Sequence, residues 1–378
     1  MALSEFVKKY FDKKAVHIQG EPDKFYGLFD WNSLNDMLAT IFLTEQQIKL
    51  SSDGKYFLTK DRNRILSEVH RGATLIVENA DNLEHNIRHF LNRLSDEICT
   101  STRINLYLSF PDKQGYTIHY DTHDFFILQI EGYKHWDVYP QTIESPLFFQ
   151  KKHARTPPSE EQAYLSCTLG KGDVLYVPKG HWHKAMAVRE PSVHLTLAVF
   201  VPTGIDFLSW FVDELREDPV IRRSLPFFTK EDFDKSPYIK EQLSEYVQAL
   251  GKMFFEKICA KDTVTSYYRY YIARQKNRVP FNFPDQFTED IDTLCAVKTF
   301  RKLPLPTFLN DTSDEKIEII AAGKVISLGK RAESLLRLIT TREEFSINDL
   351  ISVSGLTHRE IYQVLLALVR EGIIEISD

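Results

Sequence analysis

The spacing of apolar residues changes along the chain and predicts regions of different structure. Between residues 79 and 99 apolar residues recur every three or four positions, the period of an amphipathic helix: Leu83, Ile87, Phe90, Leu91, Leu94 and Ile98. From residue 105 to 201 the pattern becomes short apolar runs rich in β-branched and aromatic residues, separated by Gly, Pro and Asp clusters. Such runs predict a β-rich core, either a sandwich or a barrel.

Helical spacing returns after Pro202, where the strand pattern ends. The apolar positions of a first helical stretch are Phe207, Leu208, Phe211 and Leu215. A second stretch has a heptad-like seam with alternating steps of four and three: Ile239, Leu243, Tyr246, Leu250 and Met253. A seam of this kind packs either within the chain or against a second copy, and the pattern leaves both interpretations open.

The last region, from about residue 311 to 378, has the pattern of a hairpin around Ala322-Gly323, then three helices and a closing strand. Thr357 and Glu360 have the spacing of a capping box, which marks the start of the last helix. A helix-turn-helix core followed by a strand resembles a winged-helix domain. The region carries 8 basic and 12 acidic side chains, a net charge of −4, whereas a surface that follows phosphates is basic. We therefore expect a structural or protein-binding role here rather than DNA binding.

Composition is that of a soluble globular protein. The 378 residues are 43% hydrophobic and 26% charged, and 47 basic against 53 acidic residues give a net charge of −6. The acidic balance disfavours a general affinity for nucleic acid. No apolar run approaches the roughly 18 residues that cross a bilayer, and the first residues lack the apolar core of a signal peptide. We expect a cytoplasmic protein with no membrane partner.

The four cysteines, Cys99, Cys167, Cys259 and Cys295, show no CxxC spacing. This pattern gives no sign of a thiolate metal site or a redox pair, so we interpret them as ordinary buried thiols.

The strongest chemical signal is His119-Tyr120-Asp121, within a segment, residues 117–121, that we predict to be a strand. Alternation along a strand places residues i and i+2 on one face, so an imidazole and a carboxylate can converge there. A third candidate is His183, which follows an apolar strand and a Pro-Lys-Gly turn. In a rolled sandwich that strand can return beside the first one. His181, two residues earlier, is the alternative ligand and is otherwise expected to face solvent.

Two histidines and one carboxylate form the facial triad of non-haem Fe(II) oxygenases, which leaves three positions open for a co-substrate and dioxygen. The competing interpretation is that HxD is a chance surface pair, and the motif alone does not exclude it. Lys134 follows an apolar strand and would need an anionic partner if buried. The alternative for Lys134 is that its amine extends to the surface.

The chain resembles the JmjC-type cupin oxygenases. The segments that carry the resemblance are His119-Tyr120-Asp121, residues 125–136 and residues 172–183. It is most similar to the ribosomal oxygenase branch, the protein hydroxylases related to the bacterial ribosomal-protein arginine hydroxylase and the animal nucleolar histidine hydroxylases. The segment from Tyr10 to Gly20 and the order of the three regions extend the likeness over most of the chain.

The resemblance implies an α+β fold with a double-stranded β-helix core of the cupin, or jelly-roll, type. A JmjC catalytic domain would span residues 1–204, a helical dimerisation domain residues 205–300, and a winged-helix-like domain residues 311–378.

The resemblance also implies the site. Fe(II) would be held by His119, Asp121 and His183, and 2-oxoglutarate would be the co-substrate, with Lys134 on its distal carboxylate. Asn105 matches a position near the co-substrate in that family. Thr196, between Leu195 and Leu197, is a further candidate to reach the pocket. Because His194 lies two residues before Thr196, both should occupy the same face of the sheet.

The implied activity is that of a dioxygenase that hydroxylates a side chain of a protein or peptide, such as a ribosomal protein, and acts as a homodimer. Three alternatives stay open at this point: the same chemistry on a peptide natural product or a methyl-lysine, a metal-binding cupin that is not an oxygenase, and a non-catalytic regulator built around the winged helix.

Overall fold

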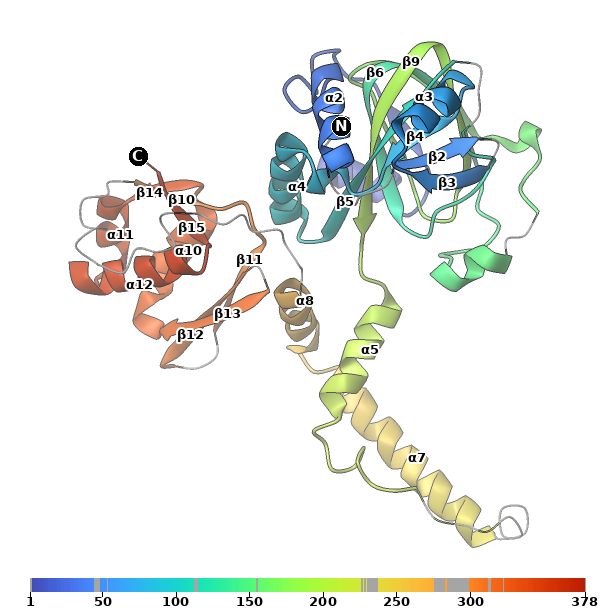
Figure 1. Ribbon diagram of the computed structural model, residues 1–378. Helices are drawn as coiled ribbons and strands as arrows, with labels where there is room; N and C mark the ends of the chain where they lie inside the picture. The colour runs from blue at the N-terminus through green and yellow to red at the C-terminus, as the bar shows by residue number, and fades with distance from the viewer. Residues whose placement is uncertain are drawn as a thin grey trace. The chain divides into compact units, whose positions relative to one another are not determined.

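The computed structural model describes the chain except for residues 1, 44–47, 53, 112–114, 154–155, 226, 228, 230–236, 275–282, 284–298, 312–313, 322 and 378. The chain forms two units, Met1–Val201 and Pro202–Asp378 (Figure 1). None of the helices in the described part is long and apolar enough to cross a membrane.

An antiparallel sheet of nine strands forms the first unit, as the apolar runs predict. Its strands run in the order β1-β8-β6-β9-β5-β4-β2-β3, and β7 pairs with β6. Their bounds are β1 (Val16–Ile18), β2 (Ile48–Ser52), β3 (Lys55–Thr59), β4 (Thr74–Val77), β5 (Ser101–Ser109), β6 (Asp124–Tyr139), β7 (Leu165–Leu169), β8 (Val174–Val177) and β9 (Trp182–Phe200).

The two long strands, β6 and β9, roll this sheet. They pair with each other along almost their whole length, while β6 also pairs with β8 through its first half and with β7 through its second half. Their register shifts between Gln129 and Glu131 and again between Glu131 and Tyr133. Such irregularities bend a strand and increase its twist, so both long strands contribute to both halves of the rolled sheet.

Gly132 occupies the bend of β6. Its φ of +68° lies in the left-handed region, and a Cβ placed there would lie 2.2 Å from the carbonyl oxygen of Pro191. Only glycine combines this conformation with so close an approach of two backbones.

Helices cover the outer face of β5 and its neighbours. The helices and 3-10 turns of this unit are α1 (Leu3–Lys9), α2 (Trp31–Leu43), α3 (Arg62–His70), η1 (Ala80–Asn82), α4 (His85–Ile98), η2 (Phe148–His153) and η3 (Glu160–Gln162). The helix predicted over residues 79–99 is confirmed as α4, which packs on β5 (Figure 1). It begins at His85 because Asn79 is left-handed and the Glu84 carboxylate accepts a hydrogen bond from the Ile87 backbone, capping the helix there.

The second unit opens with helices α5 (Gly204–Leu215), α7 (Pro237–Ile258) and α8 (Thr263–Arg274). Trp210 and Phe211 of α5 pack with Tyr267 of α8 in one apolar cluster. The heptad-like seam of α7 faces its own chain at Tyr246, whose hydroxyl donates to the carbonyl oxygens of Val220 and Arg223. The side chain of Ile239 lies outside the described residues.

The remainder of this unit is a mixed helix and sheet body with its own core. One sheet has the order β14-β10-β15 and another the order β11-β12-β13. The elements are β10 (Thr299–Lys302), β11 (Thr307–Asp311), β12 (Lys316–Ala321), β13 (Lys324–Gly329), η5 (Lys330–Ala332), α10 (Glu333–Thr341), β14 (Glu344–Ser346), α11 (Ile347–Ser354), α12 (His358–Arg370) and β15 (Ile374–Ser377).

The capping box, closing strand and hairpin predicted for this region are present, and one position of the hairpin turn is not described. The capping box of Thr357 and Glu360 is confirmed at the start of α12, and β15 closes the chain as predicted. β12 and β13 form the expected hairpin, although Ala322 of its turn lies outside the described residues.

The expectation of buried cysteines is wrong for the three that are described. Cys99 and Cys167 are partly buried, and Cys259 is exposed at the end of α7. Cys295 lies outside the described residues.

Replacing Gly132 with alanine tests the bend in β6. We expect Gly132→Ala to lower the free energy of unfolding by about 1–3 kcal/mol, because alanine is strained at positive φ. Gly251→Ala is the control: it lies within α7 with nothing within 4 Å of a new Cβ, and it should leave stability unchanged or slightly raised. Calorimetric melting measures both, and an unchanged melting temperature for Gly132→Ala would contradict this account of the bend.

Candidate metal centre

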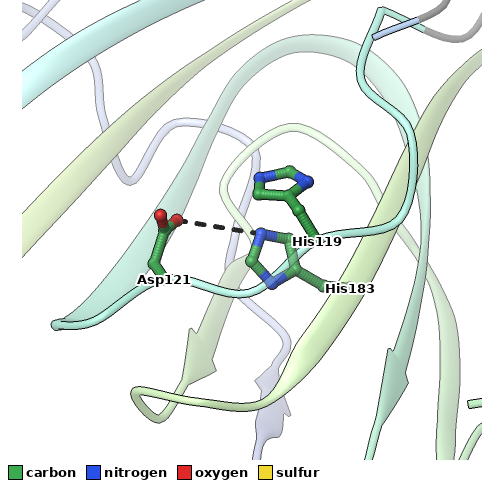
Figure 2. A group of neighbouring side chains, drawn as sticks. All are labelled: His119, Asp121 and His183. Carbon is green, nitrogen blue, oxygen red and sulfur yellow. Dashed lines mark ion pairs between the residues drawn. The ribbon is translucent and has the colours of Figure 1, made fainter. Parts of the chain in front are cut away.

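His119, Asp121 and His183 converge at one point of the rolled sheet (Figure 2). Their ligand atoms all lie within 4.8 Å of one another, and Nε2 of His183 is 3.9 Å from Oδ2 of Asp121. The two imidazole ring centroids are 4.4 Å apart. His183 is buried and the other two are partly buried, so the group faces a restricted space.

Backbone hydrogen bonds hold the three residues together. The His119 amide donates to the His183 carbonyl at 3.1 Å, and the His183 amide donates to the His119 carbonyl at 2.8 Å. The amide of Gly180, in the turn before β9, donates to the Asp121 carbonyl at 2.7 Å. Two segments distant in sequence are thereby joined at the positions of the three side chains.

The expected strand over residues 117–121 is wrong. Within it His119 alone forms a bridge, to His183, and the neighbouring backbone is irregular. The backbone carbonyls here have partners other than a neighbouring strand: the Thr117 carbonyl bonds to the His119 side chain, and the Asp121 carbonyl bonds to the Gly180 amide in the turn before β9. The expected alternation still holds: Tyr120 between the two candidate ligands is buried in a cluster with Trp182 and Tyr139.

Each histidine of the group has one nitrogen occupied by a carbonyl. Nδ1 of His119 is 2.8 Å from the Thr117 carbonyl oxygen, and Nδ1 of His183 is 3.1 Å from the His181 carbonyl oxygen. A carbonyl oxygen only accepts, so each Nδ1 carries a proton when the ring is neutral. This tautomer leaves both Nε2 lone pairs available to a metal ion.

A pocket adjoins the three residues, and its wall is built from residues two apart on successive strand segments. These pairs are Phe125 and Ile127, Lys134 and Trp136, His183 and Ala185, and His194 and Thr196. Tyr107, Thr74, Tyr116, His119 and Asp121 complete the lining. The period of two along β6 and β9 thus directs one set of side chains inward.

Lys134 is buried in this pocket, with 5% of its surface exposed, so the alternative of a surface lysine is wrong. Its Nζ donates to Oγ of Ser109 at 2.8 Å and lies 3.5 Å from Nδ1 of His194, and Ser109 Oγ lies 3.1 Å from Thr74 Oγ1. Among the described residues no carboxylate pairs with it. Burial lowers the pKa of Lys134 to about 7. Burial and the neighbouring Lys134 lower the pKa of His194, which favours the neutral imidazole.

The other candidate residues have different positions. Thr196 and His194 both line the pocket, as their spacing predicts. Asn105 lies directly opposite Thr196 in the sheet, but it is not among the residues that line the pocket. Its Oδ1 accepts a hydrogen bond from the Asn79 backbone amide at 2.9 Å. His181 is buried rather than exposed, and its Nδ1 bonds to the Tyr164 hydroxyl outside the pocket.

Several pocket residues were not identified from the sequence. Tyr107 follows Asn105 by two and Trp136 follows Lys134 by two, so alternation alone could have found both. Tyr107 stacks on His194, with ring centroids 4.9 Å apart and planes 3° from parallel. Thr74 and Tyr116 line the pocket from other segments, and Ser109 contacts Lys134. No spacing rule connects these three residues to the motif.

The lowered pKa of Lys134 has a measurable consequence for stability. Lysine in an unfolded chain titrates at about pH 10.4, so between about pH 7 and pH 10 the unfolded chain binds more protons than the folded one. Stability should therefore rise with pH in this window, and Lys134→Met should abolish that contribution. Urea unfolding at several pH values measures the difference between the two proteins, and a difference that does not vary with pH would contradict a buried, titrating amine.

Comparisons with known proteins agree with this geometry. Residues 82–207 match the family model described as JmjC domain. Ribosomal oxygenase 1 of Gallus gallus is 27% identical over 274 residues, which cover 68% of this chain and 45% of that protein. The bifunctional lysine-specific demethylase and histidyl-hydroxylase NO66 of Dictyostelium discoideum is 27% identical over 216 residues, 53% of this chain and 41% of that protein. The chain thus spans less than half the length of these relatives.

A solved structure of the Escherichia coli ribosomal oxygenase YcfD aligns with 100% of this chain and 98% of its own, with a TM-score of 0.64 and 19% identity. YcfD in complex with cobalt and 2-oxoglutarate aligns with a TM-score of 0.62 and 17% identity. At this identity the likeness shows the fold, a cupin core with mixed helices and sheets. Residues 82–207 thus match the JmjC domain, and the chain is similar to proteins named ribosomal oxygenases, as its motifs indicate.

Proposed function

We propose that this protein is an Fe(II)- and 2-oxoglutarate-dependent dioxygenase that hydroxylates a side chain of a protein or peptide. One observation carries the proposal: two histidines and an aspartate converge in a pocket that also buries a lysine without a carboxylate partner.

The donor set fits Fe(II). Two imidazole Nε2 atoms and one carboxylate match the facial triad, and the carbonyl bonds at both Nδ1 atoms fix the tautomer that a metal requires. His119, Asp121 and His183 would be the ligands. Iron bound there would supply the reaction of dioxygen with 2-oxoglutarate and with a substrate C–H bond.

The lysine end of the pocket fits the second carboxylate of 2-oxoglutarate. A buried ammonium needs a charged partner, and a dicarboxylate anchored at the metal would supply one to Lys134. Ser109 orients the amine by accepting one of its hydrogens. Thr196 lies on the same wall, and we keep Thr196 and Asn105 as proposed contacts of the co-substrate region.

The remaining walls orient the co-substrate and exclude water. Phe125, Ile127 and Ala185 present hydrocarbon to the pocket, and the Tyr107 ring holds His194 by stacking. An apolar lining that excludes water strengthens the attraction between Lys134 and a carboxylate, because the local dielectric constant is low.

The class of substrate is supported by the relatives. Their names describe a ribosomal oxygenase and a bifunctional lysine demethylase and histidyl hydroxylase. We therefore propose a protein substrate, for example a ribosomal protein. Demethylation of a methyl-lysine is the second candidate, favoured by the name of the second relative. A mass spectrum separates them, since hydroxylation adds one oxygen and demethylation removes a methyl group.

The second unit, in this proposal, supplies assembly. Apolar side chains that are at least 44% exposed lie on three helices: Ile205, Leu208 and Val212 on α5, Val247 and Phe255 on α7, and Val264 on α8. A second copy of the chain would cover them, giving a homodimer through the helical domain, residues 205–300. We also propose a winged-helix fold for residues 311–378, with a structural or protein-binding role, and a cytoplasmic location.

Succinate formation tests the activity. We expect iron-loaded protein supplied with 2-oxoglutarate and air to form succinate, and His119→Ala to abolish this by removing a ligand. Lys134→Ala should raise the KM for 2-oxoglutarate by at least about thirtyfold, the cost of losing one partner of a buried charge pair. His70→Ala and Lys171→Ala, both outside the pocket, are the matched controls. Equal succinate formation by wild type and both pocket variants would refute the proposal.

Light scattering tests the dimer. We expect wild type to have the mass of two chains, and the double variant Val247→Asp with Phe255→Asp to have the mass of one, because two carboxylates would enter an apolar interface. Gln248→Asp adds a charge on the same helix and should stay dimeric. A monomeric wild type would exclude this assembly.

A further inference from the structure

Trp136 has an indole N–H that finds no acceptor in the described chain, although its nitrogen is buried. The residue is 5% exposed and lines the pocket. Among the described residues of the first unit, Gln129 Oε1 is the other buried polar atom in this state, and Gln129 does not line the pocket. A buried donor without an acceptor lowers the stability of the fold, so native folds rarely keep one without a reason.

Trp182 shows how the same sheet treats another buried indole. It is 3% exposed, and its Nε1 donates to Oγ1 of Thr142 at 2.9 Å. The fold thus provides an acceptor for Trp182, which lies outside the pocket, and none for Trp136, which lines it. This contrast points to a ligand as the missing acceptor.

The ring of Trp136 lies near both Lys134 and His183. Its centroid is 5.9 Å from Nζ of Lys134 and 6.1 Å from the ring centroid of His183. Lys134 and Trp136 are two apart on β6, so they face the same side of the sheet. The ring also meets His194 edge to face at 5.6 Å, which fixes its plane.

We propose that the indole N–H of Trp136 donates a hydrogen bond to an oxygen of bound 2-oxoglutarate, which makes Trp136 a recognition residue for the co-substrate. The inference rests on the proposed function, because it takes the ligand that spans His183 and Lys134 to be this dicarboxylate. The donor belongs to a wall that is otherwise hydrocarbon at Phe125, Ile127 and Ala185. Trp136 therefore selects a ligand with an acceptor at this place over an apolar one of the same shape.

Nuclear magnetic resonance of the indole protons observes this hydrogen bond directly. The chain has four tryptophans, so protein labelled with 15N in the indole gives four resonances, and Trp136→Phe assigns one of them. The protein is loaded with diamagnetic Zn(II) and then titrated with 2-oxoglutarate. We expect the Trp136 proton to move downfield by more than those of Trp31, Trp182 and Trp210.

Binding of 2-oxoglutarate to the phenylalanine variant provides the second readout. Trp136→Phe keeps an aromatic ring and loses the donor, so calorimetry should show affinity for 2-oxoglutarate reduced by about tenfold or more, the usual effect of losing a hydrogen bond to a charged group. Affinity for Zn(II) alone should be unchanged, since the indole is not a ligand. A structural role would instead lower the affinity for both.

The outcomes separate this inference from the function on which it rests. If 2-oxoglutarate binds in a manner that depends on Lys134, but the Trp136 resonance stays in place and Trp136→Phe binds equally well, the recognition role is overturned and the proposed function stands. If Zn(II)-loaded wild type does not bind 2-oxoglutarate at all, both are overturned.

Discussion

The reciprocal pair of backbone hydrogen bonds between His119 and His183 is the interaction on which the rest of the site depends. It joins the irregular segment before β6 to the first residues of β9, and it fixes the two imidazoles with their ring centroids 4.4 Å apart. Backbone bonds set this distance, so the side chains need only the correct tautomer, and the Thr117 and His181 carbonyls impose it. Contacts within the protein thus orient both imidazoles toward the point that they share with Asp121.

The pocket also depends on the rolling of the sheet. Ser109 of β5 and Lys134 of β6 belong to strands that are separated in the sheet by β9, yet Lys134 donates to Ser109 at 2.8 Å. They meet because the bend at Gly132 turns the second half of β6 across the interior. The same bend places a lysine and a pair of histidines in one pocket, and this combination of a cation with metal ligands suits a dicarboxylate.

Much of this arrangement follows from the sequence, and the rest has a definable cause. Period-two spacing predicted the shared face of His194 and Thr196, and the motif predicted which side chains approach one another. The strand expected at residues 117–121 does not form, because the Thr117 and Asp121 carbonyls bond to a side chain and to a turn instead of to a neighbouring strand. The spacing of residues in the sequence does not reveal such contacts. Ser109 and Thr74 were missed because their meeting with Lys134 depends on how the sheet closes. Asn105 lies opposite Thr196, as a residue on the pocket face should, but it does not line the pocket. Its side-chain oxygen instead accepts a hydrogen bond from the backbone amide of Asn79, which has a left-handed conformation.

The central claim is that His119, Asp121 and His183 bind Fe(II) and leave adjacent positions open for 2-oxoglutarate. Visible absorption of the anaerobic Fe(II) protein tests it most directly, because a 2-oxo acid that chelates Fe(II) through two oxygens gives a charge-transfer band. We expect the band to rise as 2-oxoglutarate is added, to saturate at one equivalent per chain, and to be absent in Asp121→Ala. A wild-type protein that gives no band, or an Asp121→Ala variant that gives the same band, would contradict the claim.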